Sequence, residues 1–325
     1  MDERAGGIAP TYHVPVMLPE VLSALAVDPN GDYADGTLGG GGHASAILDL
    51  IRGSGHLYAF DADPGAIANA SVRFGDDLGI RIIVRQAYFT EACEMLAAEG
   101  IRLAGVLLDL GVSSRQLDSD QIGLSYRQEM PLDTRFDATA RPRSAADIVN
   151  DDSPEKIATL LRQYGEEPAA WKIAQAIARG RSGRRLATTT DLREVIESVI
   201  PGHFLIKTLS RVFQALRIAV NDELGELERG LDGFIPLLRS GGRFAVLTYH
   251  SLEDRIVKDK FRDEERSCVC PPEFPLCRCD KVQRLKTLNR KPALPTAEEI
   301  ERNPRARSAK LRVAERVEGA VKHNL

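Results

Sequence analysis

Strand-like and helix-like segments alternate through the first third of the chain. Four apolar runs of strand length lie at residues 33–35, 56–61, 81–85 and 105–110, and helix-length segments separate them. Pro64 lies near the start of the second such segment, where the first turn of a helix tolerates proline. This order is typical of parallel strands joined by crossover helices. The sequence therefore predicts an α/β fold with a parallel sheet.

The alternation stops after Gly111, and the following hundred residues read as turns and amphipathic helices. Ser153 and one of Thr188–Thr190 are the expected N-caps of two of these helices. One long helix is expected over residues 210–238, before a strand signal returns in the segment GGRFAVLTYHS. We therefore predict a discontinuous α/β domain of residues 1–112 and 210–325 and an inserted helical domain of residues 113–209.

Composition constrains where the protein is located and which partners its charge favours. The 325 residues contain no uninterrupted apolar run near the roughly 18 residues of a membrane span, and the N-terminus lacks a signal-peptide layout. A cytoplasmic location is expected. The formal net charge is only −4, so a nucleic-acid partner has to be inferred from local charge.

A glycine-rich turn follows the first predicted strand. In YADGTLGGGGHASAIL, residues 33–48, a strand end leads through five glycines into a helix. Backbone amides and a helix N-terminus meet a bound nucleotide in this geometry. Gly39, Gly41 and Ala44 also satisfy the degenerate G-x-G-x-x-A dinucleotide pattern. The loop alone therefore fits either an NAD-type cofactor or S-adenosylmethionine.

Acidic residues end three of the strands. Asp61 can accept hydrogen bonds from ribose hydroxyls, which both cofactors carry. Asp35 precedes the glycine turn, where it would repel a pyrophosphate but suit the cationic amino-acid part of S-adenosylmethionine. Asp109 could accept a hydrogen bond from an amino group of adenine or substrate. Each could instead be a cap or turn residue, but their recurrence favours the methyl donor.

The cysteines are unevenly spread. Cys93 is solitary, whereas Cys268, Cys270, Cys277 and Cys279 form the pattern Cys-x-Cys-(x6)-Cys-x-Cys. Four thiolates are enough for tetrahedral zinc, but each pair is closer than the usual two intervening residues. Reduced thiols and zinc ligands both remain open, and no metal is predicted at the cofactor loop.

With these features placed, the chain resembles a family of bacterial methyltransferases, the RsmH or MraW family. The segments DGTLGGGGHASAIL, AFDADPGAI, LLDLGVSSRQLD, GLSYRQEMPLDTRFD, FQALRIAVNDEL and GGRFAVLTYHSLEDRIVK carry the resemblance. The family methylates the exocyclic amino nitrogen of a cytidine in the decoding region of 16S ribosomal RNA. The resemblance implies a Rossmann-like class I methyltransferase domain with an inserted helical domain for substrate recognition.

The resemblance also implies which residues bind S-adenosylmethionine. They are Gly41, Gly42, His43, Asp61, Phe89, Asp109 and Gln116. From the residues alone, His43 could equally face solvent, whereas Phe89 offers an apolar surface for adenine. Asp109 is also our candidate for orienting the substrate amino group, although cofactor binding would explain it as well.

Further residues are assigned to the substrate side as hypotheses. Asp133, Arg135 and Asp137 could contact substrate or form an internal ion-pair network. His250 and Ser251 end the returning strand, where Ser251 could instead cap a helix.

Local charge favours RNA. Residues Lys281 to Arg316 hold eleven Lys or Arg against four Asp or Glu, and Arg179, Arg181, Arg184 and Arg185 form a basic turn near Trp171. A solvated basic face is the alternative. The expected partner is 16S ribosomal RNA or the small ribosomal subunit, with no membrane. The sequence leaves open a homodimer, and two other functions: an NAD-type oxidoreductase and a non-enzymatic ribosome-binding factor.

Overall fold

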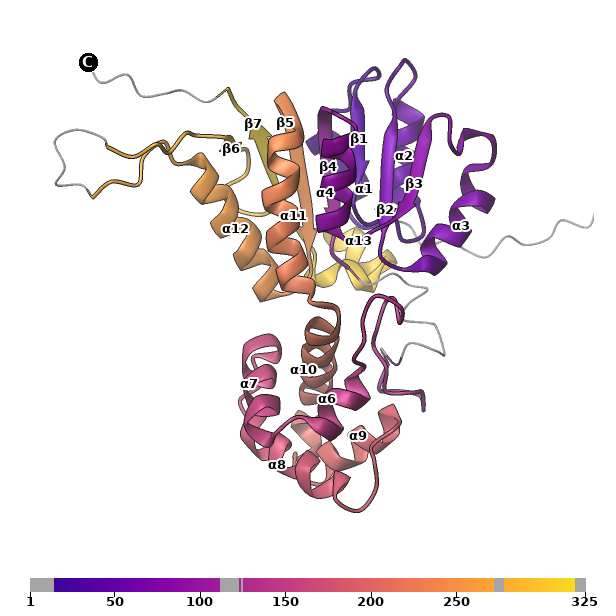
Figure 1. Ribbon diagram of the computed structural model, residues 1–325, viewed down its shortest axis with the longest axis vertical. Coiled ribbons are helices and arrows are strands. Elements are labelled where there is room, and N and C mark those ends of the chain that lie inside the picture. The colour runs from indigo at the N-terminus through magenta and orange to yellow at the C-terminus, as the bar shows by residue number, and fades with distance from the viewer. Residues whose placement is uncertain (1–14, 112–122, 124, 272–277, 319–325) are drawn as a thin grey trace, which may run out of the picture.

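We describe the protein from a computed structural model, which covers residues 15–111, 123, 125–271 and 278–318 (Figure 1). A sheet with helices on both faces forms one part, and a group of helices below it in Figure 1 forms the other. Gln116 and Cys277 lie outside the described residues, so their predicted roles are not addressed by the structure.

The sheet holds seven strands within the described residues, in the order β3-β2-β1-β4-β5-β7-β6. They are β1 Asp32–Asp35, β2 Leu57–Asp61, β3 Ile82–Gln86, β4 Leu103–Asp109, β5 Leu238–Thr248, β6 Leu285–Thr287 and β7 Lys310–Arg316. Strands β1 to β5 are parallel, as predicted, and β7 is antiparallel to both of its neighbours. The carboxyl ends of β1 to β5 therefore share one side of the sheet, here called the carboxyl edge.

Helices bury both faces of the sheet. The helices of this part are α1 Leu18–Leu25, α2 Gly42–Leu50, α3 Pro64–Phe74, α4 Phe89–Ala98, α11 Glu223–Leu237, α12 Ser251–Glu265 and α13 Ala297–Arg302. Side chains alternate along a strand, so Phe244 of β5 packs with α11 and α12, whereas Leu247 packs with α1 and α2. The Phe244 ring meets Phe234 of α11 and Phe261 of α12 at centroid distances of 6.2 and 5.8 Å. In the described parts of the chain, no helix combines the length and apolar character needed to cross a membrane.

The second part is a helical group with a core of its own. It contains α6 Ala145–Asp151, α7 Pro154–Gly165, α8 Ala170–Arg181, α9 Thr189–Glu197 and α10 Gly202–Asn221. The predicted caps are confirmed: the Ser153 hydroxyl accepts from the backbone N–H of Lys156, and the Thr188 hydroxyl accepts from that of Asp191. Each cap satisfies one backbone donor that the first helical turn leaves unpaired.

The long helix expected over residues 210–238 is wrong, because the chain turns at Asp222. Asp222 has a left-handed φ of 54°, which separates α10 from α11. Asp tolerates this conformation better than most residues, so no glycine marks the break. The predicted domain boundary at residues 209/210 lies inside α10, whose side chains join the helical core as far as Val220. The division into domains stays a prediction.

Strands β6 and β7 were not predicted from the sequence. They lie within the Lys281–Arg316 stretch whose charge we assigned to RNA. Arg312 of β7 is buried and pairs with Asp254, its Nε lying 2.7 Å from Oδ1. Part of the basic surplus is therefore neutralised inside the fold.

Candidate active site at the carboxyl edge of the sheet

The predicted glycine loop joins β1 to α2 at the carboxyl edge. Gly39 and Gly41 have φ of +50° and +74°, in the region that favours glycine. A Cβ on Gly41 would lie 2.7 Å from Cδ of Arg73, and one on Gly42 would lie 2.4 Å from Cγ of Pro15. The left-handed φ at position 41 and the close contact with Pro15 at position 42 therefore favour glycine, independently of any ligand.

Asp61 ends β2 beside this loop. Its Oδ2 accepts a hydrogen bond of 2.7 Å from the backbone N–H of Gly39, and its Oδ1 accepts one of 2.8 Å from that of Asp63. Each oxygen keeps a second lone pair. Burial raises the pKa of Asp61 to about 7, although these two donors oppose the shift. A ligand that donates further hydrogen bonds to this carboxylate would favour its ionised form.

Asp35 ends β1 and is 1% exposed. Its Oδ1 accepts from the backbone N–H of Thr37 at 3.0 Å and from the Thr37 hydroxyl at 3.2 Å. Burial raises the pKa of Asp35 to about 6, against the effect of these bonds and of nearby His43. A cation bound in this region would stabilise the carboxylate, as predicted for the charged portion of the methyl donor.

Asp109 ends β4 and is held from three directions. Its backbone N–H donates to the Thr37 hydroxyl at 2.7 Å, and its Oδ1 accepts from the Tyr249 hydroxyl at 2.7 Å. Oδ2 lies 3.5 Å from Nδ1 of His43. His43 is buried, and its Nε2 lies 3.0 Å from the Val16 carbonyl, which can only accept a hydrogen bond. The solvent-facing reading of His43 is therefore wrong.

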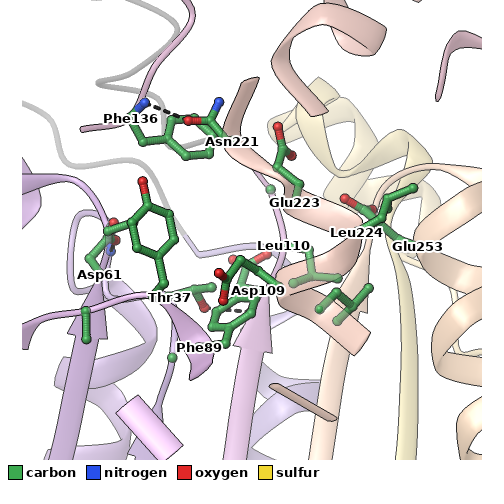
Figure 2. A pocket seen from close by; sticks show the side chains of 18 residues that line it. Thr37, Asp61, Phe89, Asp109, Leu110, Phe136, Asn221, Glu223, Leu224 and Glu253 are labelled. Atoms are coloured by element: carbon green, nitrogen blue, oxygen red, sulfur yellow. Dashed lines mark hydrogen bonds between the residues drawn. The ribbon is translucent and has the colours of Figure 1, made fainter. Parts of the chain in front are cut away.

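A cleft opens between these strand ends and the junction of α10 with α11 (Figure 2). Its volume is about 800 Å³, the open space at the mouth included. Figure 2 shows Asp61 on one side, Glu223, Leu224 and Glu253 on the other, and Phe89 and Asp109 between them. The cleft thus brings together three of the predicted cofactor residues. Gly41, Gly42 and His43 are not among the residues that line the cleft, and their contact with a cofactor stays a prediction.

Several cleft residues were missed by sequence reasoning. They are Tyr88, Phe136, Asn221, Glu223, Leu224, Glu226 and Glu253. Asn221 is buried at the end of α10, where its Oδ1 accepts from the backbone N–H of Phe136 at 2.9 Å and its Nδ2 donates to the Thr134 carbonyl at 2.8 Å. The break at Asp222 places Asn221, Glu223, Leu224 and Glu226 at the cleft, and no glycine or proline at position 222 marks that break in the sequence.

The hypothesised substrate residues make internal contacts. Arg135 forms a two-pronged ion pair with Asp133, with N–O distances of 2.6 and 2.7 Å. Asp137 accepts from the Thr139 hydroxyl at 2.7 Å and from Nε2 of Gln86 at 2.9 Å. These contacts are those of an internal network, the alternative to substrate contact.

The alternative in which Ser251 caps a helix is wrong. His250 caps α12, and its Nδ1 accepts from the backbone N–H of Glu253 at 3.4 Å. Ser251 is the first helical residue, and its hydroxyl donates to Glu166 of the helical part at 2.5 Å. Ser251 thus links the two parts of the molecule.

Two arginines of the predicted basic turn, Arg184 and Arg185, form ion pairs. Arg184 pairs with Asp191, and Arg185 pairs with Asp147 at 2.8 Å. Both arginines are more than half exposed, and exposed pairs contribute little stability, so RNA phosphates could compete for them. Trp171 is 42% exposed.

The strand order, the glycine loop after β1 and the acidic strand ends define a Rossmann-like class I methyltransferase. The MraW methylase family matches residues 10–317. The chain is 46% identical over 309 residues to ribosomal RNA small subunit methyltransferase H of Symbiobacterium thermophilum, with 93% of this chain and 95% of that one covered. The protein of the same name from Trichlorobacter lovleyi is 46% identical over 310 residues, with 94% and 98% covered.

A third relative of that name, from Heliobacterium mobile, is 45% identical over 317 residues, with 94% of this chain and 99% of that one covered. The chain belongs to the MraW methylase family and is an S-adenosylmethionine-dependent methyltransferase. The resemblance inferred from the sequence is confirmed, and the NAD-type alternative is removed.

Proposed function

We propose that this protein transfers the methyl group of S-adenosylmethionine to the exocyclic amino nitrogen of a cytidine in the decoding region of 16S ribosomal RNA. Family membership supports the reaction class, and the names of the relatives support small-subunit ribosomal RNA as the substrate. One observation carries the site: the fixed carboxylate of Asp109 at the centre of the cleft.

Residues of the cleft, and Asp35 at the neighbouring end of β1, fit the cofactor. Asp61 has lone pairs for the two ribose hydroxyls, Phe89 offers an apolar ring, and the buried carboxylate of Asp35 suits a nearby cation. When bound, S-adenosylmethionine supplies an electrophilic methyl group. We assign Gly41, Gly42 and His43 to the same site as supporting residues, His43 through its contact with Asp109.

Asp109 is suited to receive an amino group. The nitrogen lone pair of a cytidine amine is delocalised into the ring, and hydrogen bonds accepted from its N–H groups help to localise that lone pair for attack. Tyr249 contacts Oδ1 of Asp109, and His43 contacts Oδ2. A further lone pair remains on each oxygen. Asp109 can thus orient the amine while Tyr249 holds the carboxylate in place.

Charge near the cleft supports an RNA substrate. Because β7 is antiparallel to β5, with Lys310 opposite Thr248, residues just before β7 lie at the carboxyl edge. The 3-10 helix η2, Pro304–Ser308, is there, and its Arg305 and Arg307 side chains are exposed. These positive charges lie on the side of the sheet where the cleft opens, as phosphate binding requires.

The remaining predictions follow from this function. We assign substrate recognition to the inserted helical domain of residues 113–209, and a cytoplasmic location to an enzyme that acts on ribosomal RNA. A homodimer stays a prediction, which light scattering of the purified protein tests.

The direct test is single-turnover methylation of small-subunit RNA that lacks the modification, offered both free and as an assembled subunit. Mass spectrometry of the digested nucleosides should reveal N4-methylcytidine with one of the two substrates. Asp109→Asn should slow its formation by about 100-fold or more, since a charged acceptor is lost. Asp49→Asn, the same change on an exposed part of α2, is the matched control.

Transfer to another base or atom would contradict the proposal, as would no transfer to either substrate by protein that binds S-adenosylhomocysteine. A normal rate for Asp109→Asn with intact cofactor affinity would remove Asp109 from the catalytic role. Thermal stabilisation by S-adenosylhomocysteine separates the enzyme from a ribosome-binding factor that has lost its cofactor site.

A further inference from the structure

Three cysteine side chains converge in the connection between α12 and β6. The sulfur atoms of Cys268, Cys270 and Cys279 all lie within 4.8 Å of one another. Cys268 and Cys279 are eleven residues apart in the chain, so the connection folds back on itself to bring them together. The methyltransferase site does not use this cluster, because it follows the C-terminal end of α12 whereas Glu253, in the cleft, lies at the N-terminal end.

The spacing of the sulfur atoms matches metal coordination. Two thiolates bound to one tetrahedral zinc at about 2.3 Å lie about 3.8 Å apart. The Sγ atoms of Cys268 and Cys279 are 3.8 Å apart. A disulfide would need a separation of about 2.05 Å. The pair therefore has the separation of two ligands on one ion.

Backbone donors point at all three sulfur atoms. The Sγ atom of Cys268 accepts a hydrogen bond of 3.4 Å from the backbone N–H of Cys270. Cys270 accepts from Arg278 at 3.3 Å, and Cys279 accepts from Val269 at 3.4 Å. A neutral thiol is a weak acceptor, whereas a metal-bound thiolate carries negative charge that such donors stabilise. These backbone donors would stabilise thiolate sulfur atoms bound to a metal ion.

The described residues of the connection form no apolar core that could order it. None of its described residues between Glu265 and Leu285 is buried. Ion pairs hold its returning end to α12: Lys281 to Asp263 at 2.6 Å, and Arg284 to Glu264. Small segments without a core commonly depend on a metal or a cross-link for a defined fold.

We propose that Cys268, Cys270 and Cys279 bind a structural zinc ion that folds the connection between α12 and β6. Thiolate ligands favour zinc, and these three would fill three of the four positions of its tetrahedral coordination. Binding of the ion would stabilise the folded loop. The exposed Arg266 and Arg278 of this loop would then become protected from trypsin. Methyl transfer requires no contribution from the ion.

Elemental analysis of the full-length protein, purified in reducing buffer without chelator, tests the proposal. We expect about one zinc per chain. Cys268→Ser and Cys279→Ser should each weaken zinc affinity by more than about 100-fold, measured by competition with a chromophoric chelator. Cys93→Ala is the matched control, since Cys93 is buried in the core beside α11 and should leave the zinc content unchanged.

Limited proteolysis gives a second readout. Removal of zinc from the wild-type protein should speed tryptic cleavage in the connection, and returning zinc should reverse the effect, whereas thermal stabilisation by S-adenosylhomocysteine should persist in all variants. Less than about 0.1 zinc per chain after reconstitution, a different stoichiometric metal, or full zinc retention by the serine variants would overturn the site. So would a disulfide between these cysteines in the freshly purified protein.

Discussion

The Tyr249 hydroxyl donates a hydrogen bond of 2.7 Å to Oδ1 of Asp109, joining the ends of β5 and β4. Burial, with Asp109 close by, raises the pKa of Tyr249 well above its usual value. The tyrosine therefore stays protonated at any pH at which the enzyme works, and it acts only as a donor toward Asp109. This relationship fixes the orientation of the carboxylate to which we assign the substrate amine.

Tyr249→Phe should slow single-turnover methylation by about 10- to 100-fold, because the change removes one hydrogen bond to a charged group. Affinity for S-adenosylhomocysteine should change much less, because we assign the Asp109 carboxylate that Tyr249 holds to the substrate amine. Tyr58→Phe, the same chemical change within the sheet, is the control. Equal losses of rate and cofactor affinity would show that Tyr249 supports the cofactor instead.

Cofactor affinity should fall in acid. The pKa values of Asp61 and Asp35 are raised to about 7 and about 6 by burial, and bound cofactor favours the ionised form of both. At a pH below these pKa values, cofactor binding must therefore release protons from the two carboxyl groups. For Asp61 alone, affinity at pH 6 should be about tenfold weaker than at pH 8.

Calorimetric titration with S-adenosylhomocysteine between pH 5.5 and 8.5 measures this dependence. Asp61→Asn should bind more weakly at pH 8 and lose the step near pH 7. An affinity of the wild-type protein that does not change with pH would contradict the assignment of Asp61 to an ionised, ligand-binding state.

Charge at the carboxyl edge should set the salt dependence of RNA binding. Arg307→Glu should weaken binding of small-subunit RNA and lower the slope of log K against log salt by about 1. Arg52→Glu places the same charge change at the opposite edge of the sheet, after α2, and should have little effect. Filter binding across a salt series compares the two, and equal effects would rule out a specific RNA path along this edge.

Asn221 should be a stability determinant. Asn221→Ala would leave the N–H of Phe136 and the carbonyl of Thr134 without their partner, which costs about 2 to 4 kcal/mol of unfolding free energy. Urea denaturation measures the loss. Asn30→Ala, at an exposed turn, should stay within about 0.5 kcal/mol of the wild type. A similar small value for Asn221→Ala would mean that water replaces the lost bonds.

The sheet was largely predictable from the sequence, because its buried parallel strands read as short apolar runs between helical patterns. Asp35, Asp61 and Asp109 could be found for the same reason, since each ends such a run. Tyr249 could not, because nothing local to it indicates that β5 places its hydroxyl beside Asp109.

Two errors have physical causes. The turn at Asp222 lies in a continuous helical pattern and is not marked by a glycine or proline at that position, so its left-handed backbone was not visible in the residues. The basic stretch at the C-terminus was counted by charge, which does not distinguish an exposed side chain such as Arg307 from Arg312, buried against Asp254. Counting charges therefore overestimates the surface available to RNA.

Mass spectrometry of nucleosides from the small-subunit RNA of cells lacking this protein tests the proposed function most directly. Loss of N4-methylation at one cytidine of the decoding region, restored by the wild-type protein and not by Asp109→Asn, is the predicted result. Retention of every methylated cytidine in those cells would contradict the proposed function.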